Sequence, residues 1–182
     1  MPKYIAFLRG LNVGGHRVQM ADLCAHFESI GFANAESFIA SGNIIFEART
    51  TNTAAMEKKI EAHLLKSLGY EVATFVRSVA EVAAISKYKP FKDGVLKSAT
   101  ALNVGFLTEP PTTAAVAGLM KHRSADDDFH LNGREVYWAC KTRQSDSAFF
   151  KVGFEKALKA RVTVRNVNTI ARLAEQHAPG GK

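Results

Sequence analysis

The sequence predicts an α+β fold, a tandem repeat of two ferredoxin-like (βαββαβ) subdomains followed by a C-terminal helix. Short runs rich in β-branched and aromatic residues alternate with longer runs whose apolar residues recur at helical spacing. Two pairs of β-rich runs are separated only by short turns, at Ser41-Gly42 and at Asn132-Gly133, which is typical of hairpins. The same order of elements occurs twice along the chain, and this repeated order predicts two subdomains.

The first half begins with a strand at residues 3–9, KYIAFLR, in which both alternating sets of side chains are mostly apolar. Such a strand is expected at the centre of a sheet, with its helix-free side covered by the other subdomain or by a second chain. A helix is expected from Met20 to Ile30, with Gly31 as its left-handed C-terminal residue. Strands at 36–40 and 43–48, a helix at 51–69 capped by Thr53, and a strand at 72–77 complete this half.

A boundary is expected within residues 79–98, where a short helical pattern is followed by a connection containing Pro90, Asp93 and Gly94. The predicted domains are therefore a first subdomain at 1–78, a helical linker at 79–98, and a second subdomain with a C-terminal helix at 99–182. The elements expected after the linker are strand 101–107, helix 113–122, strands 128–131 and 134–140, helix 147–160, strand 162–164 and helix 169–177.

Composition places the chain among globular proteins. Its 182 residues are 47% hydrophobic, which is ample for a buried core. The N-terminal apolar run is short and is broken by Arg9, so neither a signal peptide nor a membrane span is expected, and a cytoplasmic location follows as the default. Cys24 and Cys140 show no metal-binding spacing and are expected to be reduced, packed thiols.

The positive charge is concentrated toward the two ends of the chain. The formal net charge is +7, and residues 1–19 contain Lys3, Arg9 and Arg17 without any acid. Residues 141–182 are also strongly basic, whereas the long middle stretch is slightly acidic. This asymmetry suggests an anionic small molecule, a nucleotide or nucleic acid as ligand, with a merely solvated basic surface as the alternative.

The glycine-rich segment FLRGLNVGGHRVQM, residues 7–20, is the most distinctive loop in the sequence. Gly10 and Gly15 have the spacing of a phosphate-binding loop, but His16-Arg17 stand where lysine and a hydroxyl residue are required. The spacing alone therefore does not establish a nucleoside triphosphate site. The glycines also have a purely structural explanation, since they allow a tight turn in which Asn12 bonds its own loop.

Sheet topology places this loop beside a second polar turn. In the predicted fold the third strand lies antiparallel between the first and second strands, so the end of the first strand at Arg9 meets the start of the third at Asn43. The loop and this turn are thus expected to form an anion site together with the N-terminus of the following helix. The expected ligand-binding residues of this corner are Arg9, Asn12, Gly14, Gly15, His16, Ser41 and Asn43.

Each side chain of this corner has a suitable chemistry. Arg9 can pair with a phosphate or carboxylate through its two-pronged guanidinium, and Asn12 and Asn43 can orient the ligand. His16 is the one weak candidate for proton transfer. A second motif, RNVNT at 165–169, adds Arg165, Asn166 and Asn168 as ligand-binding residues, although Asn168 or Thr169 is also expected to cap the last helix.

Six sequence motifs together resemble a known bacterial family. They are RGLNVGG, SGNIIF, the PF of the linker, FLTEPP, REVYW and RNVNT, in that order along nearly the whole chain. The chain is similar in these motifs to the family catalogued as domain of unknown function 1697. The resemblance implies a two-subdomain α+β protein of repeated ferredoxin-like units, without an established activity, a known cofactor or a known catalytic set. The last motif of the family usually carries tryptophan where this chain has Val167.

Other chemistries find less support in the sequence. The six histidines lack the spacing of a zinc enzyme, Asp126, Asp127 and Asp128 are expected in a solvated loop, and Ser41 lacks the context of a nucleophile. No metal and no cofactor are expected. The predicted function is that of a binding protein for a small anionic ligand, a nucleotide or phosphorylated metabolite. The alternatives are a transferase or hydrolase acting on a phosphorylated small molecule, and a nucleic-acid-binding or protein-interaction module.

Overall fold

The computed structural model describes residues 1–39 and 42–177, and it divides the chain into two compact units. The first unit comprises residues 1–84 together with the described residues from Leu173 onward, and the second comprises residues 85–172. Each unit contains a four-stranded antiparallel sheet with the βαββαβ order, which confirms the predicted fold class. The division falls inside the expected linker, and the end of the last helix groups with the first unit.

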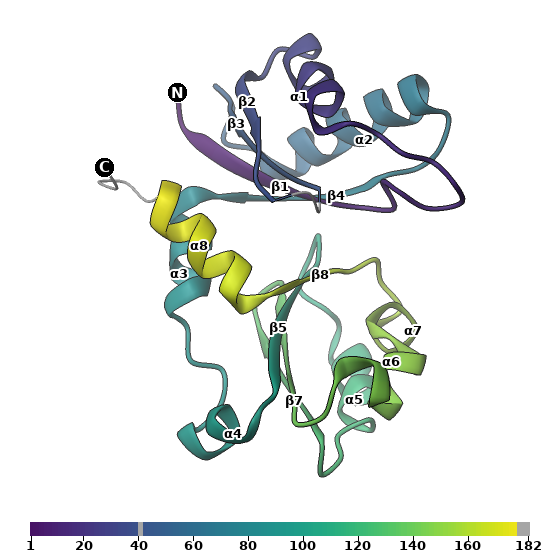
Figure 1. Ribbon diagram of the computed structural model, residues 1–182, viewed down its shortest axis with the longest axis vertical. Helices are drawn as coiled ribbons and strands as arrows, with labels where there is room; N and C mark the ends of the chain where they lie inside the picture. The colour runs from purple at the N-terminus through teal and green to yellow at the C-terminus, as the bar shows by residue number, and fades with distance from the viewer. Residues whose placement is uncertain (40–41, 178–182) are drawn as a thin grey trace. The chain divides into compact units, whose positions relative to one another are not determined.

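The first unit has the strand order β2-β3-β1-β4, with two helices on one face of the sheet (Figure 1). The central strand β1 is buried on both faces, as predicted, since every residue from Tyr4 to Leu8 is buried. Tyr4, Ala6 and Leu8 belong to the core beneath the helices. The elements of this unit are β1 (Lys3–Arg9), α1 (Met20–Ser29), β2 (Ala33–Ser37), β3 (Asn43–Glu47), α2 (Thr53–Leu68), β4 (Ala73–Ser78) and the start of α3 (Val79–Lys87).

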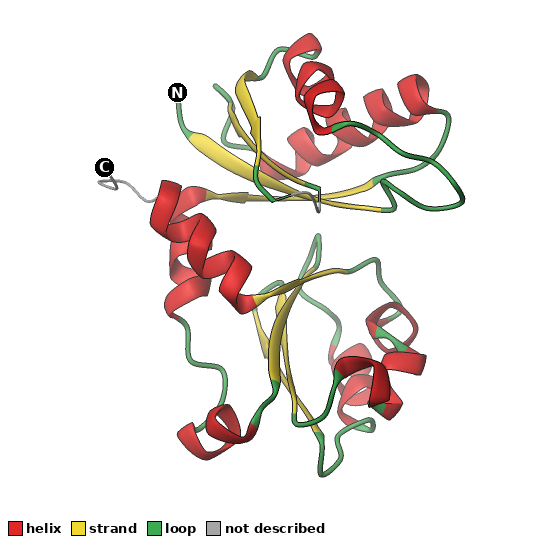
Figure 2. Ribbon diagram, viewed as in Figure 1, coloured by secondary structure: helices red, strands yellow, loops and turns green. Residues whose placement is uncertain are grey.

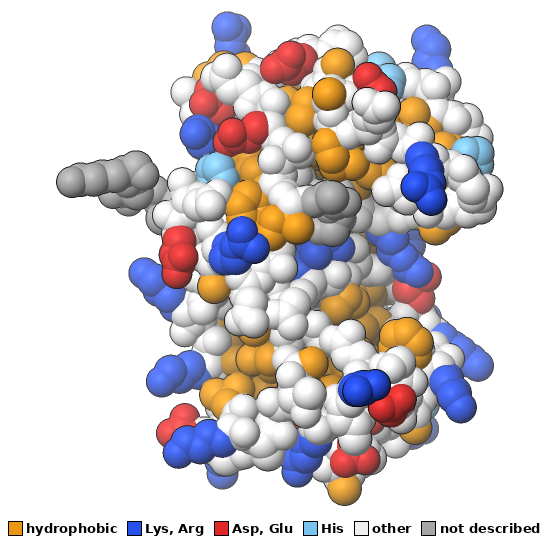
Figure 3. All heavy atoms as spheres, viewed as in Figure 1, with side chains coloured by type: hydrophobic (Ala, Val, Ile, Leu, Met, Phe, Trp, Pro, Cys, Tyr) orange, Lys and Arg blue, Asp and Glu red, His pale blue; other side chains and the backbone are white. Residues whose placement is uncertain are grey.

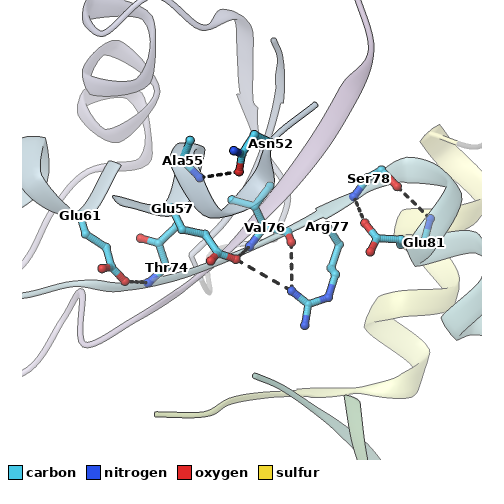
Figure 4. A network of polar contacts seen from close by, with 9 residues as sticks. All are labelled: Asn52, Ala55, Glu57, Glu61, Thr74, Val76, Arg77, Ser78 and Glu81. Carbon is cyan, nitrogen blue, oxygen red and sulfur yellow. Dashed lines mark hydrogen bonds and ion pairs between the residues drawn. The ribbon is translucent and has the colours of Figure 1, made fainter. Parts of the chain in front are cut away.

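Three glutamates close the outer edge of this sheet along β4 (Figure 4). The carboxylates of Glu61 and Glu57 on α2 accept hydrogen bonds from the backbone N–H groups of Thr74 at 2.9 Å and Val76 at 2.8 Å. Glu81 on α3 accepts from the N–H of Ser78 at 2.7 Å. Alternate residues of an edge strand direct their N–H groups away from the sheet. These carboxylates accept hydrogen bonds from such N–H groups, which could otherwise pair with a strand of another chain.

Two details of the first unit differ from the sequence prediction. Strand β2 ends at Ser37 rather than continuing to residue 40, because Ile39 has a left-handed backbone (φ 51°) that no strand can include; residues 40 and 41 lie outside the described part. Helix α2 is capped by Asn52, whose side chain accepts from the N–H of Ala55 at 3.0 Å, and not by Thr53. Gly31 is left-handed (φ 90°) after α1, as expected.

The end of the last helix packs within the first unit. Leu173 and Ala174 of α8 (Val167–His177) are buried. The His177 ring lies edge-on to Phe38 with 6.2 Å between ring centroids, and its Nδ1 is 3.7 Å from a carboxylate oxygen of Glu36. Burial lowers the pKa of His177 although Glu36 acts in the opposite direction, so desolvation is the stronger effect.

The second unit repeats the arrangement with the strand order β6-β7-β5-β8 (Figure 2). The helices α5, α6 and α7 lie on one face of this sheet, where Trp138, Phe149 and Phe154 form an aromatic core. Its elements are α4 (Asp93–Ser98), β5 (Ala101–Phe106), α5 (Thr113–Met120), β6 (Asp127–Asn132), β7 (Glu135–Cys140), a 3-10 turn at Gln144–Asp146, α6 (Ala148–Val152), α7 (Phe154–Leu158), β8 (Thr163–Asn166) and the start of α8.

Local residues also change the predicted boundaries here. The single helix expected at 147–160 is broken at Gly153, whose backbone (φ 77°, ψ 157°) is outside the helical region. Helix α8 begins at Val167 because Asn166 accepts the backbone N–H of Asn168 at 2.9 Å, so Asn166 is the capping residue in place of Asn168 or Thr169. The expected connection at 89–98 contains the short helix α4.

The expectation of a solvated aspartate loop is wrong for Asp127. This residue begins β6 and is 3% exposed. Its carboxylate accepts hydrogen bonds from the indole Nε1 of Trp138 at 2.8 Å and from the hydroxyl of Ser147 at 2.8 Å. Asp127 therefore joins β6 to β7 and to the start of α6. Among the described residues, no helix is long and apolar enough to cross a membrane.

Candidate functional site

The end of β1 and the start of β3 meet at one corner of the first unit, as the topology predicted. Phe7 is paired with Asn43, and the backbone N–H of Leu8 donates to the carbonyl of Gly42 at 2.8 Å. The long loop at residues 10–19 starts at this corner and leads to α1; it is the green segment between β1 and α1 in Figure 2. Ser41 lies outside the described residues.

Hydrogen bonds within the loop hold its shape. The side-chain oxygen of Asn12 accepts from the N–H of Val18 at 3.2 Å, and the N–H of His16 donates to the carbonyl of Val13 at 3.1 Å. Gly14 and Gly15 both have left-handed backbones, with φ of 62° and 83°. Non-glycine residues rarely adopt this conformation, so the double glycine has a structural reason.

Tyr70, which follows α2, fastens the loop to the body of the unit. Its ring stacks on the imidazole of His16, with centroids 4.2 Å apart and planes inclined by 23°. Its hydroxyl donates a hydrogen bond of 2.7 Å to the carbonyl of Leu11. Tyr70 thus contacts the loop at two points, at His16 through its ring and at Leu11 through its hydroxyl.

The predicted residues of the corner fall into two groups. Arg9, Asn12, Gly14, Gly15 and His16 are exposed, and within the described part of the chain nothing accepts a hydrogen bond from the N–H of Gly14 or Gly15. Asn43, in contrast, is fully buried, and its side-chain amide donates to the carbonyl of Phe38 at 3.1 Å. The amide of Asn43 therefore stabilises the turn between β2 and β3.

A groove of about 490 Å³ lies where the loop runs into α1. Arg17 of the loop lines it together with His26 and Ser29 of α1, which are one helical turn apart. Asp22 is the one acid among the described residues that line it. The remaining lining residues are Val18, Ala25 and Leu68.

His26 and Ser29 of this groove also belong to a hydrogen-bonded cluster of histidine and serine side chains on α1 and α2. Nδ1 of His26 is 3.0 Å from Nε2 of His63, and the hydroxyls of Ser29 and Ser67 lie 3.3 Å and 3.4 Å from the same Nε2. Burial lowers the pKa of His63, with further contributions from His26 and Lys66, so the neutral ring is favoured. No group of three or more side chains able to hold a metal ion occurs among the residues described.

The three predicted residues of the RNVNT motif belong to the second unit. Arg165 on β8 donates through Nη1 to the hydroxyl of Thr163 at 2.8 Å and to the carbonyl of Val164 at 3.0 Å. Burial lowers the pKa of Arg165 to about 10. Asn166 caps α8, and Asn168 lines a cavity of that unit.

Sequence reasoning missed Tyr70, Arg17, His26 and His63 as parts of this region. His26 and Ser29 are three residues apart, and His63 and Ser67 four apart, so each pair shares a helix face. That spacing was readable from the sequence. Which face of α2 meets α1, however, depends on how the two helices pack.

Comparisons with known proteins agree with this architecture. The model of the family described as "Protein of unknown function (DUF1697)" matches residues 1–137. No curated protein matches the chain. Among solved structures, the chain is similar to the conserved bacterial protein SP0830 from Streptococcus pneumoniae, with 22% sequence identity and a TM-score of 0.76 over 97% of this chain and 98% of that one. At this identity the likeness concerns the fold. The family match covers most of the chain, and the protein therefore belongs to the DUF1697 family.

Proposed function

We propose that this protein is a cytoplasmic binding protein for a small anionic ligand, a nucleotide or phosphorylated metabolite, held at the loop between β1 and α1. The observation that carries the proposal is the groove at the end of this loop, where the guanidinium residue Arg17 is joined by the imidazole of His26 and the hydroxyl of Ser29. Guanidinium, imidazole and hydroxyl groups can all donate hydrogen bonds to phosphate oxygens.

The loop is ordered before any ligand arrives. Tyr70 holds it through a ring stack and a hydrogen bond, and Asn12 closes it onto Val18. Binding of a ligand therefore does not require a further loss of conformational entropy in the loop, and this favours affinity for a small molecule. The exposed backbone of Gly14 and Gly15 offers N–H donors beside the imidazole of His16, and Arg9 of the same segment is exposed as well.

The buried central strand favours a small ligand over nucleic acid. Proteins that bind single strands on a sheet stack the bases on exposed aromatic side chains, whereas Tyr4 and Phe7 of β1 are buried. On the face drawn in Figure 3, lysine and arginine side chains are dispersed, with acidic side chains among them. A continuous basic stripe, as expected for a phosphate backbone, is not seen on that face.

The test is calorimetric titration with two matched pairs of ligands, AMP against adenosine and glucose 6-phosphate against glucose. We expect the wild type to bind at least one phosphorylated member and to bind its uncharged partner far more weakly. Arg17→Ala should weaken this binding by roughly tenfold, since a charge-assisted hydrogen bond is lost. Asp22→Asn should strengthen it, because the carboxylate of Asp22 lines the groove and repels an anionic ligand.

Arg49→Ala is the control, because Arg49 is an exposed arginine elsewhere on the first unit and its loss changes the net charge equally. Equal affinities for wild type, Arg17→Ala and Arg49→Ala would show that the groove is not the binding site. Failure of the wild type to bind either phosphorylated ligand would remove the proposal. A steep fall of RNA affinity with salt in gel shifts would instead support the nucleic-acid alternative.

A further inference from the structure

The second unit contains a small cavity that is separate from the loop and groove of the first unit. Its volume is about 220 Å³, and it lies among α3, β5, β7 and the first turns of α8. Ile85, Leu102 and Ile170 give it apolar walls, and Tyr88, Tyr137 and Asn168 add polar groups. Among the described residues, no lysine, arginine, aspartate or glutamate lines it. A charged ligand would therefore be poorly solvated there.

The hydroxyl of Tyr137 is the unusual group at this cavity. Tyr137 is 1% exposed, and its hydroxyl has no hydrogen-bond partner among the described residues. Such groups are rare in folded proteins, because a buried hydroxyl without a partner lowers stability. The side-chain amide of Asn103 is the other unpartnered buried group in the described residues, but it does not line the cavity.

Neighbouring side chains in the described part of the chain pack against the ring of Tyr137 but give its hydroxyl no hydrogen bond. The ring of Tyr88 lies 5.3 Å from that of Tyr137 between centroids, inclined by 35°. The Tyr88 hydroxyl is already engaged, since it lies 2.7 Å from Nε2 of His130. Burial, followed by Glu135 and Tyr88, raises the pKa of Tyr137, so its hydroxyl keeps its proton at neutral pH and can act as a donor.

We infer that this cavity binds a small uncharged molecule, about the size of one ring, whose carbonyl oxygen accepts a hydrogen bond from the Tyr137 hydroxyl. The apolar walls suit a hydrocarbon body, and the missing partner of Tyr137 calls for one acceptor. The volume is adequate, since an apolar cavity of about 150 Å³ accommodates benzene. Asn168 offers a second polar contact, because its side-chain amide has no hydrogen bond within the described residues.

The experiment compares cyclohexanone with methylenecyclohexane, which has nearly the same shape but carries CH2 in place of the oxygen. Binding to the full chain is measured by NMR titration. We expect the wild type to bind the ketone roughly tenfold more tightly, the value of one hydrogen bond to a buried donor. Tyr137→Phe should abolish this preference while still binding both molecules.

Tyr70→Phe is the matched control, since it removes one tyrosine hydroxyl from the first unit and should leave the preference unchanged. Leu102→Trp should block both molecules by filling the cavity, with circular dichroism confirming that the variant is folded. A crystal of the wild type soaked with cyclohexanone gives an independent readout, with the ketone oxygen expected at the Tyr137 hydroxyl. Water alone at that hydroxyl, an unchanged preference in Tyr137→Phe, or no binding of either molecule by the wild type would overturn the inference.

Discussion

The guanidinium of Arg77 and the carboxylate of Glu57 lie 4.0 Å apart, and both side chains are almost completely buried. Glu57 also accepts the backbone N–H of Val76 at 2.8 Å, and Nη1 of Arg77 donates to the carbonyl of Val76 at 3.0 Å (Figure 4). The pair thus joins α2 to the edge strand β4. Each charge is compensated by the other, so neither can be removed alone without leaving a buried charge.

Glu57→Ala should lower the free energy of unfolding by roughly 3–5 kcal/mol, because Arg77 then remains charged and buried without this partner. The measurement is urea denaturation followed by circular dichroism. Lys58→Ala, at an exposed position of the same helix, should change stability by less than about 0.5 kcal/mol. The double variant Glu57→Leu/Arg77→Met should lose less than Glu57→Ala alone; a larger loss would contradict the assignment of a compensated pair.

Tyr70→Phe should loosen the loop between β1 and α1. The substitution keeps the ring that stacks on His16 but removes the hydrogen bond to the carbonyl of Leu11, which is worth about 1 kcal/mol. Amide hydrogen exchange of residues 10–19 should become faster, while the core strands stay protected. Tyr4→Phe serves as control, and exchange in the loop that is equally fast in both variants would refute the role of Tyr70.

The free energy of unfolding should decrease in mild acid, because His63 becomes protonated more readily in the unfolded chain than in the folded one. Burial lowers the pKa of His63 below its ordinary value of 6.5, so the unfolded chain binds more protons than the folded one between that lowered pKa and 6.5. This contribution is complete above about pH 7 and is lost as the pH falls below about 6.5. Urea denaturation at several pH values gives the free energy of unfolding. As the pH is lowered, this free energy should decrease less in His63→Gln than in the wild type.

His122→Gln, a substitution in the second unit, is the control for losing one imidazole. His177 has a lowered pKa as well and is present in all three proteins, so it contributes the same slope to each. Identical pH dependence of the wild type and His63→Gln would contradict the prediction.

Asp127→Ala should destabilise the second unit by roughly 3 kcal/mol, since it leaves the buried indole of Trp138 and hydroxyl of Ser147 without their acceptor. Trp138 is the only tryptophan, so its fluorescence reports the unfolding of this unit. Asp126→Ala, at an exposed neighbouring position, should leave the transition within about 0.5 kcal/mol of the wild type. Equal transitions for the two variants would exclude a structural role of Asp127.

The arrangement of strands was predictable because periodicity and topology rules act over whole elements. The apolar residues of β1 indicated a central strand, and the crossover rule then placed Arg9 beside the turn before Asn43. The backbone conformation of single residues, which decides where an element ends, was harder to predict. Gly153 lies within an amphipathic helical pattern, yet its backbone ends α6 and separates it from α7.

The candidate site was predictable only in outline for a related reason. The loop could be recognised from its glycines, but Asn43 turned out to be buried in the turn, where its amide bonds Phe38. The contact of His26 with His63 depends on the rotation of α2 against α1, which no local pattern encodes. Unpartnered groups such as the Tyr137 hydroxyl arise from tertiary packing and cannot be recognised before the fold is known.

The first unit is built from both ends of the chain, so its two parts are translated before and after the second unit. Residues 85–172 leave the exit tunnel before Leu173 and Ala174, whose side chains are buried with the first unit. During synthesis the first unit therefore lacks these two residues until the second unit has been translated in full. A released chain that ends at residue 172 and the full sequence should therefore differ in how well their first unit resists protease.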